Sequence, residues 1–241
     1  ASLYGADVTK ALHLRKAGLG LSGNIVGDTK AVACVEDTAV SLDVLSEFIS
    51  EFRETMESFG QKGVYYAHAG AGELHIRPML NLKKTEDIEN FKSITESIAR
   101  LTKKYRGSFS GEHGDGIVRS GFLPLMIGED NYQLLKDLKH TFDPEGILNP
   151  GKIIDAWPMD ANLRYEADRE EPKISTKMDF TDNQGILRLS ENCNGSGDCR
   201  KTHLSNGAMC PSYQATKDEL HTTRGRANVL REVLTNNKAK N

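Results

Sequence analysis

The stretch GVYYAHAGAGELHIR, residues 63–77, decides how this chain is expected to fold. The residues up to His68 predict a strand that enters a loop, and Leu74 to Arg77 predict a strand that leaves it. The small residues in the loop, two of them glycines, let the backbone turn and let a ligand approach it closely. We therefore predict a hairpin-like strand pair that brings His68 and His75 together.

Amphipathic helices are predicted on both sides of this strand pair. Apolar residues recur at three- and four-residue steps in residues 42–59 and again in residues 85–105, which is typical of one helical face. Shorter helices are predicted over 123–127 and 131–142, short strands over 30–36 and 108–111, and a loop-rich approach over 12–27. Long helices that alternate with short strands predict an α+β fold, a mixed or antiparallel sheet covered by helices on one face.

Composition changes after Lys152 and divides the chain. We predict a first domain over residues 1–155, a linker rich in Asp, Glu, Arg and Pro over 156–179, and a second, smaller and mostly helical unit over 180–241. The first residue is alanine, so we expect the N-terminus to be the cut edge of a longer polypeptide or an expression remnant.

Charge and hydropathy exclude several classes of protein. The net charge of -3 and the lack of a long Lys/Arg run give no reason to expect a nucleic-acid partner. The chain has no secretory signal and no apolar run near the ~20 residues of a transmembrane segment, which predicts a cytoplasmic protein. It also has no G-x-G-x-x-G between a strand and a helix, so dinucleotide binding through that motif is not expected.

A second glycine-rich turn, Gly111-Glu112-His113-Gly114-Asp115-Gly116, supplies the other candidate site residues. Two imidazoles and a carboxylate suit a divalent transition metal, so His68, His75 and Glu112 are predicted ligands. The alternative is that they are unrelated polar residues at turns. In an extended stretch His113 points away from Glu112, which predicts a general base rather than a ligand.

Three cations are candidates for binding an anionic substrate: Arg15, Lys30 and Arg77. A bidentate Arg–carboxylate pair fixes a substrate's orientation as well as its affinity. Arg77 is the strongest of the three, because it follows His75 by two residues and lies on the same face of the strand. The alternative for each is a solvated surface charge.

Three of the four cysteines lie close together as Cys193-x5-Cys199-x10-Cys210-Pro211. An odd cluster argues against a disulfide framework. A cysteine followed by proline is a feature of iron–sulfur ligand loops, and a fourth ligand would have to come from elsewhere. The alternative is three free thiols in a glycine-rich loop. Asn149-Pro-Gly-Lys152 on its own predicts only a turn.

Three motifs in order carry a resemblance to a known family: His68-x-Gly-x-Gly-x-x-His75, then Gly111-Glu-His-Gly114, then Phe142-Asp-Pro-x-Gly-x-Leu-Asn-Pro-Gly-Lys152. Over residues 10–155 the chain resembles the C-terminal half of FAD-linked oxidases, the vanillyl-alcohol-oxidase-like flavoenzymes of the D-lactate dehydrogenase and glycolate oxidase type. Residues 36–40 look like the end of that family's first cap strand. Residues 193–227 resemble the iron–sulfur region fused behind this half in larger members.

The resemblance implies a ferredoxin-like cap domain and the oxidation of a D-2-hydroxy acid, such as D-lactate, glycolate or D-2-hydroxyglutarate, to the 2-oxo acid. It implies that His113 takes the hydroxyl proton and that the hydride goes to FAD. By the same resemblance, His68, His75 and Glu112 would hold a zinc-like ion, Arg15 and Lys30 would bind the substrate carboxylate, and Arg77 would line a further pocket position. Asn149 would lie near the flavin. Cys193, Cys199 and Cys210 would hold an iron–sulfur cluster that carries electrons to an acceptor. Through that acceptor the protein could attach to the membrane surface.

Three departures from the family pattern stand out, one of which is that the rest of the iron–sulfur region, with its further expected cysteines, is missing. Ala71 and Glu73 replace the Asp and Asn of many relatives, which affects the expected metal occupancy and pocket. The family's FAD-binding domain precedes this half and is not in the chain, so we expect the chain to be inert by itself. The rival predictions are a stand-alone metal-binding module and an interaction subunit whose partner carries the flavin.

Overall fold

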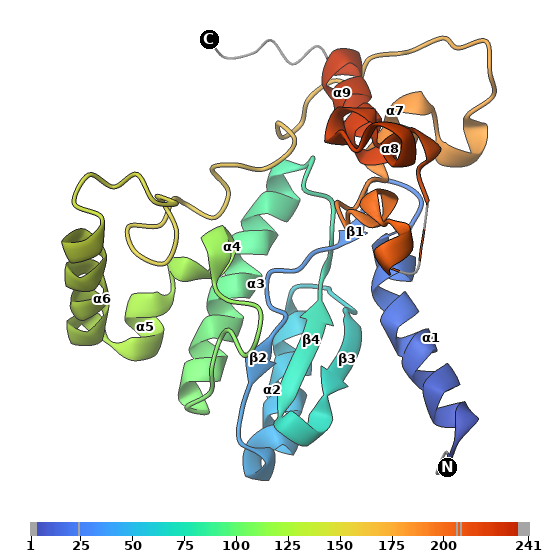
Figure 1. Cartoon of the computed structure of the whole chain (residues 1–241). Helices are drawn as coiled ribbons and strands as arrows, with labels where there is room; N and C mark the ends of the chain where they lie inside the picture. Colours follow the sequence, from blue (N-terminus) through green and yellow to red (C-terminus); the bar gives the residue numbers. More distant parts are fainter. Residues whose placement is uncertain (1–3, 24, 206, 208, 236–241) are drawn as a thin grey trace. The chain divides into compact units, whose positions relative to one another are not determined.

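The computed structural model describes residues 4–23, 25–205, 207 and 209–235, and for residues 15–23 and 205 it describes the backbone alone. The chain divides into two compact units (Figure 1), one formed by Thr29–Arg169 and the other by Ala1–Asp28 together with Glu170–Asn241. The break after Arg169 lies inside the predicted linker. The predicted functional domain boundaries at residues 155 and 180 stay a prediction.

A three-stranded antiparallel sheet forms the middle of the Thr29–Arg169 unit, in the order β2-β4-β3. The strands are β2 (Thr38–Ala39), β3 (Val64–His68) and β4 (Glu73–Arg77). A second small sheet pairs β1 (Lys30–Ala31) with β5 (Met79–Leu80), also antiparallel. The α+β class with an antiparallel sheet and the predicted hairpin are confirmed.

Helices α2 (Leu45–Ser58) and α3 (Thr85–Lys104) lie on one face of the three-stranded sheet (Figure 1). Both carry the apolar stripe that the sequence predicted, and both bury it. The core includes Phe48, Phe52 and Met56 of α2, Phe91, Ile94 and Ile98 of α3, and Leu74 and Ile76 of β4. Because side chains alternate along a strand, Glu73 and His75 of β4 point to the opposite face.

The rest of this unit is helix and irregular backbone. It contains α4 (Gly116–Ser120), α5 (Leu123–Ile127) and α6 (Glu129–Phe142), then a long stretch without regular structure. The strand expected over 30–36 is shorter, since only Lys30 and Ala31 pair with β5. The strand expected over 108–111 is a single bridge between Ala39 and Ser108.

The second unit is small and mostly helical, as predicted for the cysteine-containing segment. It contains α1 (Ala6–Gly23), α7 (Ile186–Glu191), α8 (Pro211–Thr216) and α9 (Thr223–Leu234). Arg188 of α7 forms ion pairs with Asp28 and Glu171, both at 2.7 Å. The loop expected over residues 12–27 was wrong for most of its length, because α1 continues to Gly23. Within the part of the chain that is described, no helix has the length and apolar character needed to cross a membrane.

Candidate functional site

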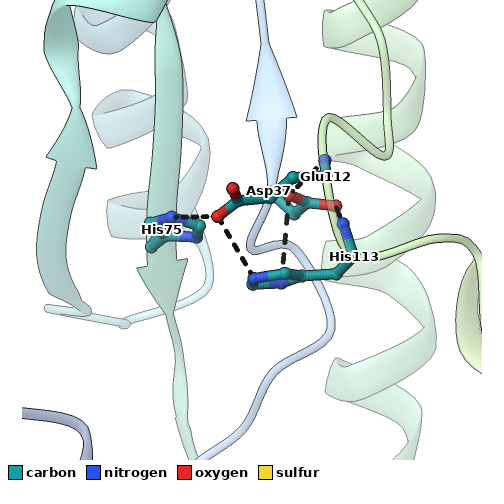
Figure 2. A group of neighbouring side chains, drawn as sticks. All are labelled: Asp37, His75, Glu112 and His113. Atoms are coloured by element: carbon teal, nitrogen blue, oxygen red, sulfur yellow. Dashed lines mark hydrogen bonds and ion pairs between the residues drawn. The ribbon is translucent and has the colours of Figure 1, made fainter.

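Three histidine side chains converge on one carboxylate oxygen. The Nε2 atoms of His68, His75 and His113 lie 3.4, 3.5 and 3.3 Å from Oε1 of Glu112. Figure 2 shows two of these imidazoles, His75 and His113, on either side of the Glu112 carboxylate. The two glycine-rich motifs, 36 or more residues apart in sequence, therefore meet at one place, as the sequence predicted.

The register of the hairpin places the first two histidines. His68 pairs with Glu73, and Tyr66 pairs with His75, so these four side chains share one face of the sheet. The rings of His68 and His75 lie 5.1 Å apart, centroid to centroid. The turn between them depends on Gly72, which has a φ of 72°, and a Cβ there would lie 2.0 Å from the carbonyl oxygen of Val40.

One side of the cluster is buried and the other is open to solvent. The His75 side chain is 3% exposed, whereas those of His68, His113 and Glu112 are 41%, 44% and 47% exposed. Burial lowers the pKa of His75, with the charges of His113 and His68 acting in the same direction. A neutral imidazole at neutral pH has a lone pair that is free to bind a metal ion.

Two neighbouring carboxyl groups, Glu73 and Asp37, lie beneath the cluster, and their pKa values shift in opposite directions. Burial raises the pKa of Glu73, and its hydrogen bond to Asp37 and the charge of Glu112 raise it further. Burial opposes the charge of Asp37, yet hydrogen bonds from Glu73 and from the amides of His113 and Glu112 lower its pKa. Glu73 is therefore the more readily protonated of the two, and in that form it donates a hydrogen bond to the Asp37 carboxylate.

The donor set fits a divalent transition metal. Imidazole nitrogens and carboxylate oxygens lie within 4.8 Å of one another in two groups that share Glu112: one with His68 and Glu73, the other with His75, His113 and Asp37. His75 Nδ1 and Glu73 Oε1 are also buried without a hydrogen-bond partner, as expected where an additional group binds. His68 and His75 belong to different groups, so Glu112 would be the ligand common to both.

Arg77 is paired with a carboxylate of the chain itself. Its guanidinium forms an ion pair with Glu36, and the two side chains are only 12% and 10% exposed. The second Glu36 oxygen, Oε1, lies 3.4 Å from Nδ1 of His113. Glu36 thus connects a predicted substrate-binding residue with the predicted base, a connection that the sequence did not predict.

Three other residues were predicted to bind substrate or flavin: Lys30, Asn149 and Arg15. Lys30 is half-buried in β1, where it pairs with Leu80. Asn149 is exposed, has a φ of 51° and accepts a hydrogen bond of 2.8 Å from Lys152. The side chain of Arg15 lies outside the described part of the chain.

The three clustered cysteines are not among the candidate ligands of a single metal ion in the described part of the chain. All are free; Cys199 and Cys210 are buried and Cys193 is half-buried. Hydrogen bonds from the Tyr213 amide and the Thr223 side chain lower the pKa of Cys210. Among the described residues, the groups of three or more candidate metal ligands contain no cysteine. An iron–sulfur cluster at these thiols stays a prediction.

Comparisons with known proteins agree with the motifs. Residues 5–153 match the model of the family described as FAD linked oxidases, C-terminal domain. Relatives described as D-2-hydroxyglutarate dehydrogenase include one from Pseudomonas putida, 37% identical over 94% of this chain, and one from Escherichia coli, 36% identical over 95%. The glycolate oxidase subunit GlcD of Bacillus subtilis is 26% identical over 58% of the chain and 29% of its own length. The chain spans 22% of the length of each of the two dehydrogenases. This chain belongs to the FAD-linked oxidases, of which it carries the C-terminal domain.

Proposed function

We propose that this chain is the substrate-side part of an FAD-dependent dehydrogenase that oxidises a D-2-hydroxy acid, with D-2-hydroxyglutarate as the first candidate. The observation that carries the proposal is the convergence of three imidazoles on Glu112 Oε1 at 3.3–3.5 Å. The names of the relatives that cover nearly the whole chain support the choice of substrate. The reaction removes a proton from the hydroxyl group and a hydride from C2.

We propose that His113 accepts the hydroxyl proton. Its imidazole is 44% exposed, so a substrate can reach it, and it lies on the loop before α4. The Glu36 carboxylate, 3.4 Å from Nδ1, stabilises the imidazolium that forms when Nε2 takes the proton. General-base catalysis of this kind contributes about 10²–10⁴-fold in rate.

His68, His75 and Glu112 would hold a zinc-like ion, which when bound polarises the substrate hydroxyl and makes its proton more acidic. FAD, bound mainly by residues outside this chain, supplies the acceptor for the hydride. Lys30, Arg15 and Arg77 stay candidates for the substrate carboxylates. Arg77 can serve only if the substrate competes with Glu36 for its guanidinium.

The metal site is tested on the chain itself. Zinc bound after dialysis is measured for the native chain, for His75→Ala, and for the control His140→Ala, which removes an exposed histidine on α6. We expect about one equivalent for the native chain and the control, and a loss of at least tenfold in affinity for His75→Ala. Equal binding by all three would overturn the metal site. Zinc binding without dehydrogenase activity in the whole protein would favour the stand-alone metal-binding module.

The reaction is tested in the whole protein by dye reduction with D-2-hydroxyglutarate or D-lactate. We expect His113→Asn to lower kcat by about 10²-fold or more. Unchanged turnover would overturn the role of His113. Electron transfer through Cys193, Cys199 and Cys210 stays a separate prediction, to be tested by iron and labile sulfide content, and we derive no step from it.

A further inference from the structure

A buried ion pair lies beneath the loop that carries Glu112 and His113. Asp37, just before β2, is fully buried, and Arg119 of α4 is 7% exposed. Nη1 of Arg119 donates to Oδ2 of Asp37 at 3.2 Å. Neither side chain has a part in the reaction proposed above.

Asp37 accepts hydrogen bonds from three consecutive amides of this loop. The Gly111 amide donates to its carbonyl oxygen at 2.7 Å. The Glu112 and His113 amides donate to Oδ1 and Oδ2, each at 2.9 Å. The Ser110 hydroxyl donates to Oδ2 at 3.1 Å. Successive N–H groups directed at one anion fix the backbone conformation of a loop, so this carboxylate determines where residues 111–113 lie.

Arg119 holds the two ends of the same loop. Nη2 donates to the Gly114 carbonyl at 2.5 Å, and Nη1 donates to the carbonyl oxygens of Phe109 at 3.3 Å and Glu36 at 2.6 Å. Only a planar guanidinium presents donors in this divergent fixed geometry, and a lysine cannot reproduce them.

The backbone at Asp37 is in a conformation that most residues avoid. Its φ is 76°, in the left-handed region where a non-glycine residue is uncommon. Strain of this kind persists where the surrounding contacts determine it, and it concentrates at functional sites. Gly111 adds a second constraint, because a Cβ there would lie 3.0 Å from Glu73 Oε1 and 3.2 Å from the Asp37 carbonyl oxygen.

We propose that Asp37 and Arg119 are positioning residues, which hold loop 110–114 so that the Glu112 carboxylate and the His113 imidazole face His68 and His75. Both Asp37 carboxylate oxygens are occupied by donors from this loop, from Arg119 and from Glu73, so Asp37 acts through the loop and not as a metal ligand. The inference deepens the proposed function and rests on it where Glu112 is taken as a metal ligand.

Asp37→Asn is the direct test, because asparagine has nearly the same shape and tolerates left-handed φ values. Its Nδ2 group, however, faces donors where Asp37 presents an acceptor. Two quantities are measured: hydrogen exchange of the Glu112 and His113 amides by NMR, and zinc affinity. We expect exchange of these two amides to accelerate at least tenfold and the zinc Kd to rise about 10–100-fold, with amide protection in α3 unchanged.

The matched control is Asp143→Asn. Asp143 is also a buried aspartate that accepts two loop amides, from Ile147 and Leu148, at 3.0 and 2.9 Å. The control should leave the Glu112 and His113 amides and the zinc Kd as in the native chain. An effect as large as that of Asp37→Asn would overturn the inference, since it would show a general consequence of losing a buried carboxylate.

The remaining outcomes separate this inference from the proposed function. If the native chain binds zinc and Asp37→Asn binds it equally well, the positioning role is wrong and the metal site stands. If the native chain binds no zinc, the metal site is wrong, and the exchange rates alone decide whether Asp37 holds the loop. If the α3 amides lose their protection in Asp37→Asn, that variant is not folded, and Arg119→Lys is measured instead. Unchanged exchange of the Glu112 and His113 amides in Arg119→Lys would overturn the inference.

Discussion

Replacing Arg77 should destabilise the Thr29–Arg169 unit, because its partner Glu36 is nearly buried. The two side chains of the pair are 12% and 10% exposed. Removing one member of a buried ion pair leaves an uncompensated charge and costs about 3–5 kcal/mol. Since both groups retain some contact with water, we expect the lower end for Arg77→Met, about 3 kcal/mol. Glu36→Gln keeps an acceptor for the guanidinium, so its expected cost is smaller, about 2 kcal/mol.

The double variant distinguishes an ion pair from two independent residues. With both charges removed, no unpaired charge remains, so the combined cost should be about 2 kcal/mol below the sum of the two single costs. With a urea m-value of about 2 kcal/mol per M, Arg77→Met alone should lower the midpoint by about 1.5 M.

Fluorescence reports this transition without interference from the second unit, because Trp157 is the only tryptophan of the chain and lies in the Thr29–Arg169 unit. The control is Arg100→Met, which breaks an exposed pair with Glu96 on α3 and should change the stability by no more than about 0.5 kcal/mol. A cost for Arg77→Met below about 1 kcal/mol, with additive behaviour in the double variant, would refute the reasoning. Arg77 would then be available for an anionic substrate without competition from Glu36.

Three further predictions concern other parts of the chain. Gly72→Ala should destabilise the Thr29–Arg169 unit by about 2 kcal/mol or more, because the added Cβ would lie 2.0 Å from the Val40 carbonyl oxygen. The stability is measured by Trp157 fluorescence in urea. Gly70→Ala is the control, and it should have a far smaller effect because no atom lies within 4 Å of its added Cβ. Burial raises the pKa of Cys34 to about 12, so at pH 8 iodoacetamide should label half-buried Cys193 well before Cys34 in mass spectra of the native chain, and equal labelling rates would contradict this burial. The Lys139 ammonium, against an opposing effect of burial and together with the amides of Leu148 and Ile147, lowers the pKa of Asp143. The ionised Asp143 carboxylate therefore stabilises the fold above the unfolded-state pKa of about 3.9, and this stabilisation is lost as the pH falls through the lower folded-state pKa. Urea unfolding between about pH 2 and 6 should show a difference in stability between the native chain and Asp143→Asn that depends on pH. Parallel curves of stability against pH for the two proteins would contradict this prediction.

The elements that the sequence predicted well are those with a strong local pattern. Helices α2 and α3 each bury a continuous apolar stripe, so the periodicity of their side chains reports their structure. The β3–β4 hairpin was recognisable because its glycines stand between two apolar strands. Helix α1 has no apolar stripe, and its residues 6–14 are exposed, so periodicity carried no signal for it.

The strand expected over residues 30–36 shows a different limit. Its second half is buried as predicted, with Cys34 and Val35 fully inaccessible, whereas Ala33 is exposed. After Val32, whose amide donates to the Pro78 carbonyl, the backbone leaves the ladder and reaches the left-handed conformation of Asp37. Burial was therefore predictable from the residue types, but the hydrogen bonds that end the strand come from residues distant in sequence.

The candidate site was also predictable where the signal is local and not where the contacts join residues distant in sequence. Histidine spacing and glycine content indicated that His68, His75, Glu112 and His113 would meet, because both signals are local. Glu36 and Arg119 were missed, and their contacts with Arg77 and Asp37 span 41 and 82 residues. The adjacent carboxylates Glu36-Asp37, directly after an apolar run, were the one sequence signal that could have indicated buried acids.

Several exceptions to the local rules occur together at the candidate site. The left-handed Asp37, the Glu73 carboxyl group with its raised pKa, and two buried polar atoms without partners, Glu73 Oε1 and His75 Nδ1, all belong to this site. Helices α2 and α3, by contrast, bury mainly apolar side chains, and the buried hydroxyls of Thr95 and Thr102 bond to backbone carbonyls one turn earlier. A stable core gains nothing from strained or unsatisfied groups, so their presence together on one face of the sheet is expected where a ligand completes the structure. On this argument, zinc should stabilise the native chain against unfolding and should have a much smaller effect on His75→Ala.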